Sequence, residues 1–166
     1  MFIATYGLKD NNYYKELEKR FADEGLIQAN IYSYIESDNN VYNYFMANGE
    51  KADFIIFSET NVNDLQDYVI YNYYNIETLE DGVPILKEFD YFLYDNVPYG
   101  VKIFDGDNDD YNKRFSFSDL IEFTTPKKDN ESYYLLIDTD SPHFDKENEH
   151  TLGYSVLEYF LTSYVK

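Results

Sequence analysis

The first 60 residues alternate between strand-like and helix-like patterns, and this alternation constrains the fold more than any other feature. Residues 54–57 read Phe-Ile-Ile-Phe and place apolar side chains on both sides of one strand, as is typical of strands covered on both faces. The order strand, helix, strand, helix, strand is read from residues 2–7, 11–24, 27–35, 41–48 and 52–58. It predicts an α/β, three-layer domain: a mostly parallel sheet with helices on both faces.

The local signals within this run are specific. Tyr14, Leu17 and Phe21 recur at the spacing of one helix face, and Gly25 follows as a residue that can end the helix. Residues 27–35 place isoleucine or a small residue at every second position, which is the period of a strand.

The remainder of the chain continues without an internal repeat or a dividing linker. We expect a short helix over residues 61–67, a strand or buried connection over 69–74, two strands over 89–94 and 97–104 around a turn, a strand over 132–138, and a closing helix over 151–165. The apolar stripe of the closing helix predicts that it packs on the first strands. A length of 166 residues fits one domain, residues 1–166.

The charge balance limits the partners. The chain has 32 acidic and 13 basic residues, a net charge of −19, which disfavours direct contact with nucleic acid or anionic membranes. An acidic chain remains suited to a basic protein partner, or to mimicry of nucleic acid. A hydrophobic content of 44% indicates a folded chain.

The absence of cysteine excludes disulfides, thiolate catalysis and cysteine-based zinc sites. No apolar run is long enough for membrane insertion, and no signal peptide is recognisable. We therefore expect a cytoplasmic chain, or an extracellular or cell-surface domain whose leader has been removed. The 20 Tyr and 13 Phe without Trp have two interpretations: AT-rich coding, or a tyrosine-lined recognition surface.

Several short motifs occur in an ordered series. They read FIATYG at 2–7, KELEKRF at 15–21, ADFIIFSE at 52–59, PYGVKIFD at 98–105 and YYLLIDTDSPH at 133–143. This series resembles one lobe of the extracellular solute-binding proteins that serve ABC transporters in Gram-positive bacteria. The resemblance implies a periplasmic-binding-protein-like single lobe, recognition of a sugar-like solute or a protein partner, an extracellular location, and an ABC permease as partner.

The loops after the first three strands supply the predicted ligand-binding site. In a parallel sheet the carboxyl ends of the strands meet at one edge, where ligands bind. The residues there are Tyr6, Glu36, Asp38, Ser58, Glu59 and Thr60. Their polar groups can hydrogen-bond a solute while Tyr6 stacks on an apolar face. The alternative is that Ser37, Asp38, Ser58 and Thr60 only cap the following helices.

The signals for catalysis or metal binding are weak. Asp105, Asp107 and Asp109 offer hard oxygen ligands at alternate positions, but Asp110 and Ser116 stand where a calcium loop needs Gly and Glu, so we predict a solvated loop.

The chain's two histidines, His143 and His150, lack helical metal spacing, and no nucleophile elbow or H-E-x-x-H motif accompanies them. Of the two roles open to His143, general base or a residue that caps or packs its turn, we predict the second. The glycines form no phosphate loop. We expect a binding protein without enzymatic activity or cofactor. The alternative function is an acidic inhibitor or nucleic-acid mimic, of the phage anti-defence type, that binds a basic nucleic-acid-binding protein.

Overall fold

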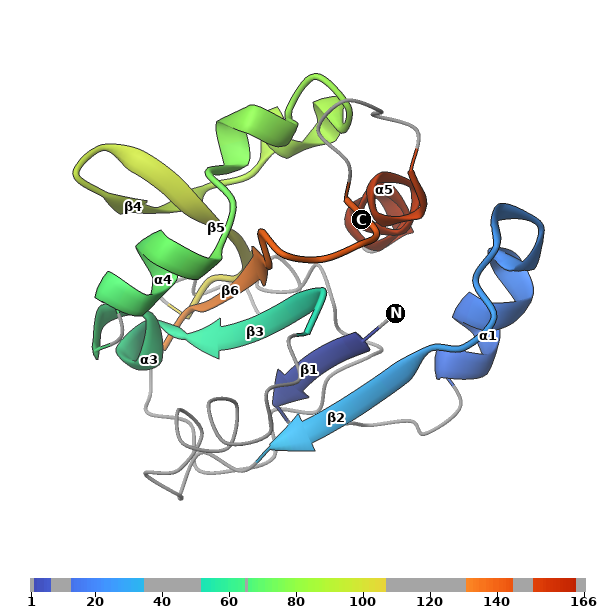
Figure 1. The fold of residues 1–166 in the computed structure, drawn as a ribbon. Helices are drawn as coiled ribbons and strands as arrows, with labels where there is room; N and C mark the ends of the chain where they lie inside the picture. Colours follow the sequence, from blue (N-terminus) through green and yellow to red (C-terminus); the bar gives the residue numbers. More distant parts are fainter. Residues whose placement is uncertain are drawn as a thin grey trace.

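A six-stranded mixed sheet forms the centre of the molecule (Figure 1). The computed structural model describes residues 2–6, 13–34, 52–64, 66–106, 131–144 and 151–163. Within them the strand order is β2-β1-β3-β6-β5-β4. The strands are β1 (Phe2–Tyr6), β2 (Asn30–Tyr34), β3 (Phe54–Ser58), β4 (Tyr91–Tyr94), β5 (Val97–Phe104) and β6 (Tyr133–Ile137).

The helices are short apart from the last one. The α-helices are α1 (Tyr13–Arg20), α3 (Glu59–Asp64), α4 (Gln66–Asn72) and α5 (Leu152–Ser163), and the 3₁₀ turns are η1 (Ala22–Glu24), η2 (Ile76–Leu79) and η3 (Pro84–Glu88). Among these described helices, none is both long and apolar enough to cross a membrane.

Strand direction overturns the predicted fold class. β1 runs parallel to β2 and β3, but β3 pairs antiparallel with β6, β6 with β5, and β5 with β4. The four strands β3, β6, β5 and β4 therefore form an antiparallel unit. The prediction of a three-layer, mostly parallel sheet resembling a periplasmic-binding-protein lobe is wrong. The prediction rests on the buried pattern of β3 and on the alternation in the first 60 residues, whereas β6, which is buried along its whole length in the same way, runs antiparallel to β3.

Several predicted elements are confirmed and others need correction. The hairpin is present: Asp95 and Asn96 take φ values of 49° and 65°, as a tight two-residue turn requires. The short helix expected over 61–67 is instead two helices, α3 and α4. The second of these, α4, takes up residues 69–72 of the strand or buried connection expected over 69–74, and the buried residues Tyr73 and Tyr74 follow it as a connection in which Tyr73 bridges to Asp138. The helix expected over residues 41–48 lies outside the described residues.

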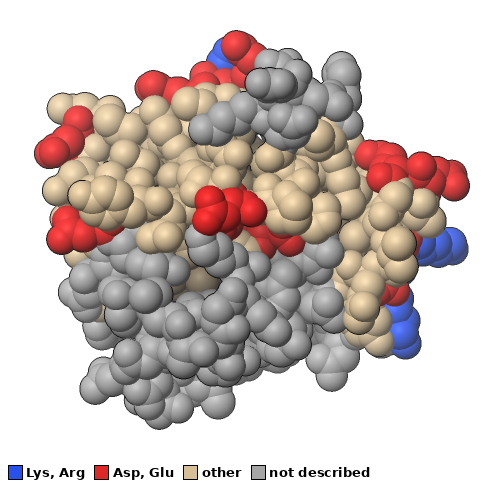
Figure 2. All heavy atoms as spheres, in the orientation of Figure 1, with Lys and Arg blue, Asp and Glu red and all other residues tan. Residues whose placement is uncertain are grey.

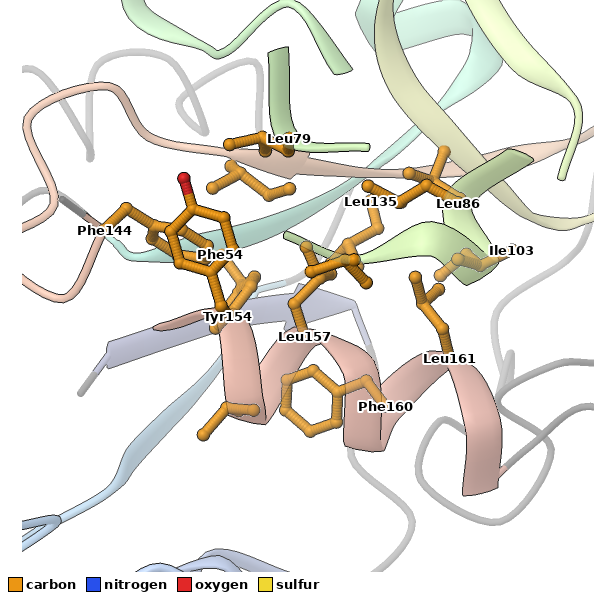
Figure 3. Packing of buried hydrophobic residues seen from close by; sticks show 14 of the residues in the cluster. Phe54, Leu79, Leu86, Ile103, Leu135, Phe144, Tyr154, Leu157, Phe160 and Leu161 are labelled. Carbon is orange, nitrogen blue, oxygen red and sulfur yellow. The ribbon is translucent and has the colours of Figure 1, made fainter. Parts of the chain in front are cut away.

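The core lies on both faces of β3. One cluster joins Phe54 and Ile56 to residues of α1, η2, η3 and α5, and Figure 3 shows α5 directing Leu157, Phe160 and Leu161 into it. The other cluster joins Ile55 and Phe57 to Val62 of α3 and to Val69 of α4. The Phe54 ring contacts those of Phe144 and Phe160 edge to face, with centroids 5.5 and 5.4 Å apart. The predicted packing of the closing helix on the sheet is therefore confirmed.

Candidate functional site

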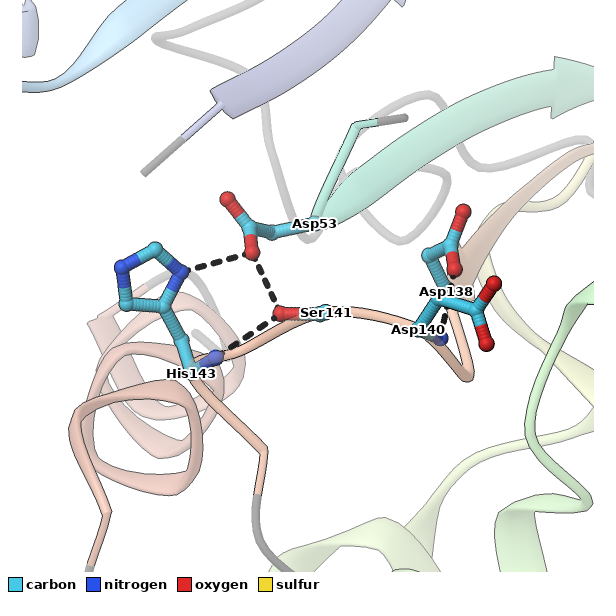
Figure 4. Close-up of polar contacts among 5 residues, drawn as sticks. All are labelled: Asp53, Asp138, Asp140, Ser141 and His143. Carbon is cyan, nitrogen blue, oxygen red and sulfur yellow. Dashed lines mark hydrogen bonds and ion pairs between the residues drawn. The ribbon is translucent and has the colours of Figure 1, made fainter. Parts of the chain in front are cut away.

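The most tightly organised polar cluster lies where β3 begins and β6 ends (Figure 4). The antiparallel register places Phe54 opposite Ile137, and the backbone N–H of Asp138 donates to the carbonyl of Asp53 at 3.1 Å. The turn that follows β6 then returns over Asp53. Ser141 and His143 come from this turn, so the fold brings them to a residue about ninety positions earlier.

One carboxylate oxygen organises the cluster. Asp53 Oδ1 lies 2.7 Å from His143 Nδ1 and also accepts a hydrogen bond from the Ser141 hydroxyl. The backbone N–H of His143 donates to Ser141 Oγ at 3.2 Å. The Asp53 side chain is only 5% exposed, whereas that of His143 is 28% exposed. Burial without these donors would be costly for a carboxylate, so the turn and the strand stabilise each other.

The contacts of His143 can be compared with the two roles considered for it, general base or a residue that packs its turn. A carboxylate acceptor requires the proton on Nδ1, and Figure 4 shows the other ring nitrogen on the side away from Asp53. An aspartate that orients a histidine also occurs in catalytic triads, but there the serine hydroxyl bonds the histidine. Here the Ser141 hydroxyl donates to Asp53 instead. The arrangement matches the predicted role of His143 in packing its turn.

The start of α5 docks closely against this turn. The N–H of Gly153 donates to the carbonyl of His143 at 2.8 Å. A Cβ atom at position 153 would lie 2.5 Å from that carbonyl oxygen and 2.7 Å from the Phe144 ring. Only glycine permits this approach.

The predicted ligand-binding residues that the structure describes lie at the other end of the strands from Asp53. The parallel register pairs Tyr6 with Tyr34 and places the ends of β1, β2 and β3 at one edge. Only the backbone of Tyr6 is described, and Glu36 and Asp38 lie outside the described residues. Ser58 is buried at the end of β3, and Glu59 and Thr60 begin α3.

Glu131 and Ser132, which the sequence analysis did not predict, meet these residues. The N–H of Thr60 donates to Glu131 Oε1 at 3.2 Å, and the N–H of Glu59 donates to the Ser132 carbonyl at 2.8 Å. The Ser132 hydroxyl accepts from the N–H of Gly106 at 3.2 Å. Glu131 therefore supplies a capping carboxylate to α3.

The metal candidates are only partly described. Asp105 lies 4.0 Å from Lys102 Nζ, while Asp107, Asp109 and His150 lie outside the described residues. In the described part of the chain, no three His, Asp or Glu side chains gather as a metal site would require.

The segment from α4 to the end of β5 carries a strong excess of acidic groups. Residues 66–106 contain eight acidic residues and two lysines. Lys87 Nζ lies 3.7 Å from Glu80, and Lys102 lies close to Asp105. Figure 2 shows acidic groups spread over the described face, with most of the basic groups on the side of α1.

This negative environment reaches a tyrosine hydroxyl. Burial, followed by the neighbouring Glu80 and Glu77 carboxylates, raises the pKa of Tyr91 to about 12. The hydroxyl donates to the Leu86 carbonyl at 2.5 Å and lies 3.3 Å from Glu80 Oε1.

Comparison of the chain with protein-family profiles, with curated proteins and with solved structures finds no match.

Proposed function

We propose that the chain is a non-catalytic binding protein whose acidic surface engages the basic surface of a protein partner. The observation that carries the proposal is the charge excess: a net charge of −19 overall, and eight acidic residues against two lysines in residues 66–106. Both of those lysines already lie beside a carboxylate. The remaining carboxylates in this segment thus act together on an approaching cation.

A nucleic-acid-binding protein is the partner class that this charge favours. Its basic groove attracts polyanions, so an acidic protein can occupy the groove and block it. In the cluster at Asp53 the Ser141 hydroxyl donates to the carboxylate and not to His143, so the cluster does not contain the serine–histidine bond of a catalytic triad.

The test is binding to protamine and to a purified basic DNA-binding protein, measured calorimetrically at low and high salt. We expect affinity to fall steeply as salt rises, because the contacts are ionic. A triple variant that neutralises exposed acids of the acidic segment, Glu77→Gln with Asp81→Asn and Glu88→Gln, should bind more weakly. The control neutralises exposed acids near α1, Glu16→Gln with Asp23→Asn and Glu24→Gln. An affinity that does not change with salt would contradict the proposal.

Recognition of a small, sugar-like solute is a second candidate. The parallel pairing of β1, β2 and β3 favours it, because it brings the ends of these strands to one edge beside Glu59 and Thr60. An ABC permease partner and an extracellular location accompany this candidate.

A thermal-shift panel of sugars at millimolar concentration tests it. A ligand of the native state should raise the melting temperature with the logarithm of its concentration, and Glu59→Gln should reduce the shift. Glu88→Gln, at an exposed position on η3, is the control. If no sugar raises the melting temperature, binding of the tested sugars at millimolar concentration is excluded.

A further inference from the structure

β4 lies at the end of the strand order and has the properties of an edge strand that binds another strand. We propose that β4 receives an extended, lysine- or arginine-rich segment of the partner, which joins the sheet as an additional strand. The inference rests on the proposed function, because it names the surface and the backbone form through which a basic partner binds.

The first support is the position of β4 in the sheet. Among the described strands β4 pairs only with β5 and ends the strand order. The N–H of Lys102 donates to the Asp90 carbonyl at 2.7 Å, so residue 90 directs its main chain toward β5. Since alternate residues of an antiparallel ladder turn to opposite sides, the next residue, Tyr91, directs its main-chain groups to the edge that no described strand covers. Such groups are a template for another strand.

The second support is an exposed apolar side chain on that strand. Leu93 is 57% exposed and is one of three large hydrophobic residues that the described surface leaves open. The register with β5 passes from Phe92–Gly100 to Leu93–Pro98, so the extra residue, Tyr99, belongs to β5 and β4 itself continues without an insertion. Leu93 thus offers an incoming strand an apolar contact beside the free main chain.

The third support is that the strand is held in place before any partner arrives. Phe92 is buried and packs on Tyr134 of β6 with ring centroids 5.8 Å apart. The Tyr91 hydroxyl is bonded to the Leu86 carbonyl, and the tight turn at Asp95 and Asn96 joins β4 to β5. A preformed edge loses little conformational entropy on binding.

Charge selects the occupant. Residues 88–95 read Glu-Phe-Asp-Tyr-Phe-Leu-Tyr-Asp and contain three acids and no basic residue. Glu88, Asp90 and Asp95 are all exposed. A strand with lysine or arginine at alternate positions complements this row. The same charge repels a second copy of this chain, whose net charge is also −19.

The experiment uses the full chain and two synthetic peptides of about ten residues in which lysine and valine alternate. The second peptide is N-methylated at every residue, which removes the strand-pairing donors of both its edges and leaves its charge unchanged. Affinity is measured calorimetrically at low salt, and hydrogen exchange follows the amides of residues 91–94. We expect the plain peptide to bind at least about tenfold more tightly and to protect β4 amides.

Two variants with the same change of charge locate the site. Leu93→Lys places a cation on the edge and should weaken binding of the plain peptide by about tenfold. Ile27→Lys is the control: Ile27 is 94% exposed and precedes β2, at the opposite end of the strand order. Thermal melting followed by circular dichroism is used to check that both variants fold.

The outcomes separate the two proposals. Equal affinity for the two peptides, with equal effects of the two variants, overturns strand addition at β4 and leaves the acidic binding function standing. Binding of the plain peptide without protection of β4 amides also overturns it. If neither peptide nor protamine binds at low salt, the proposed function fails, and the inference fails with it.

Discussion

Asp53 buries a carboxylate that two donors from one short turn hold in place. Its side chain accepts from the Ser141 hydroxyl and lies 2.7 Å from His143 Nδ1, and its backbone carbonyl accepts from Asp138. One residue thereby fixes the start of β3, the end of β6 and the approach to α5.

Replacing Asp53 by Ala should therefore destabilise the protein by about 3 kcal/mol, because two buried or half-buried donors lose a charged acceptor. Urea unfolding followed by circular dichroism measures the change. Asp81→Ala, at an exposed position on the loop before η3, is the control and should alter stability by less than about 0.5 kcal/mol. If the two variants lower the free energy of unfolding equally, the hydrogen bonds of Asp53 do not stabilise the fold.

Tyr91 predicts a dependence of stability on alkaline pH. Its pKa rises from the ordinary value of 10.0 to about 12 in the folded protein, chiefly through burial. As pH rises, the unfolded chain therefore releases the Tyr91 proton at a lower pH than the folded protein does. The stability that the protonated Tyr91 gives the folded state is complete below about pH 10 and is lost as pH rises toward 12.

The comparison with Tyr91→Phe isolates this effect, because general charge repulsion at high pH acts on both proteins. The stability difference between wild type and Tyr91→Phe should shift against the wild type between about pH 9 and about pH 10.5. Urea midpoints at the two pH values provide the measurement. A difference that stays constant would mean that Tyr91 has the same pKa in the folded and unfolded states.

At the scale of elements, the sequence predicts where strands lie better than it predicts their direction. β3 and β6 are both buried along their whole length, and such a strand has the same residue pattern whether it runs parallel or antiparallel. Direction is set by the connections, and the β4–β5 hairpin reverses the chain before β6 joins β3. The alternation in the first 60 residues correctly indicates parallel pairing of β1 with β2 and β3, but it carries no information on the later strands.

The polar contacts were harder to predict, for a related reason. Asp53 and His143 meet only because the β3–β6 register places their turns together, and neither of the motifs that contain them predicts this contact. The one feature of the sequence that points to this site is Asp53 itself, a charged residue directly before the buried strand β3. Glu131 likewise precedes a buried strand and reaches a helix 71 positions earlier.

The capping contact of Glu131 gives a prediction for α3. Glu131→Ala should lower stability by about 1 kcal/mol, because the N–H of Thr60 loses its carboxylate acceptor. Hydrogen exchange should show faster opening of α3, while β5 and β6 stay protected. Glu88→Ala, at an exposed position of η3, is the matched control. If Thr60 exchanges at the wild-type rate in Glu131→Ala, the cap does not hold the helix.

At the scale of the whole molecule, β3 connects two cores that would otherwise be separate. Phe54 and Ile56 belong to the cluster that α5 covers, and Ile55 and Phe57 belong to the cluster that α3 and α4 cover. Any distortion of the strand on one face must therefore reach the other. This arrangement predicts that the sheet and its helices on both sides unfold together as one domain.

Two core variants on opposite faces test this prediction. Phe160→Ala removes a ring 1% exposed from the α5 side, and Phe57→Ala removes one 1% exposed from the α4 side. Each should cost about 3–5 kcal/mol and lower the urea midpoint without changing the m-value. Far-ultraviolet circular dichroism and tyrosine fluorescence should give coincident single transitions in both variants. Tyr71→Ala, which removes an aromatic ring that is 82% exposed on α4, is the control and should unfold near the wild-type midpoint. If Phe57→Ala instead separates the two probes into distinct transitions, the cluster under α4 unfolds independently and β3 does not couple the two faces.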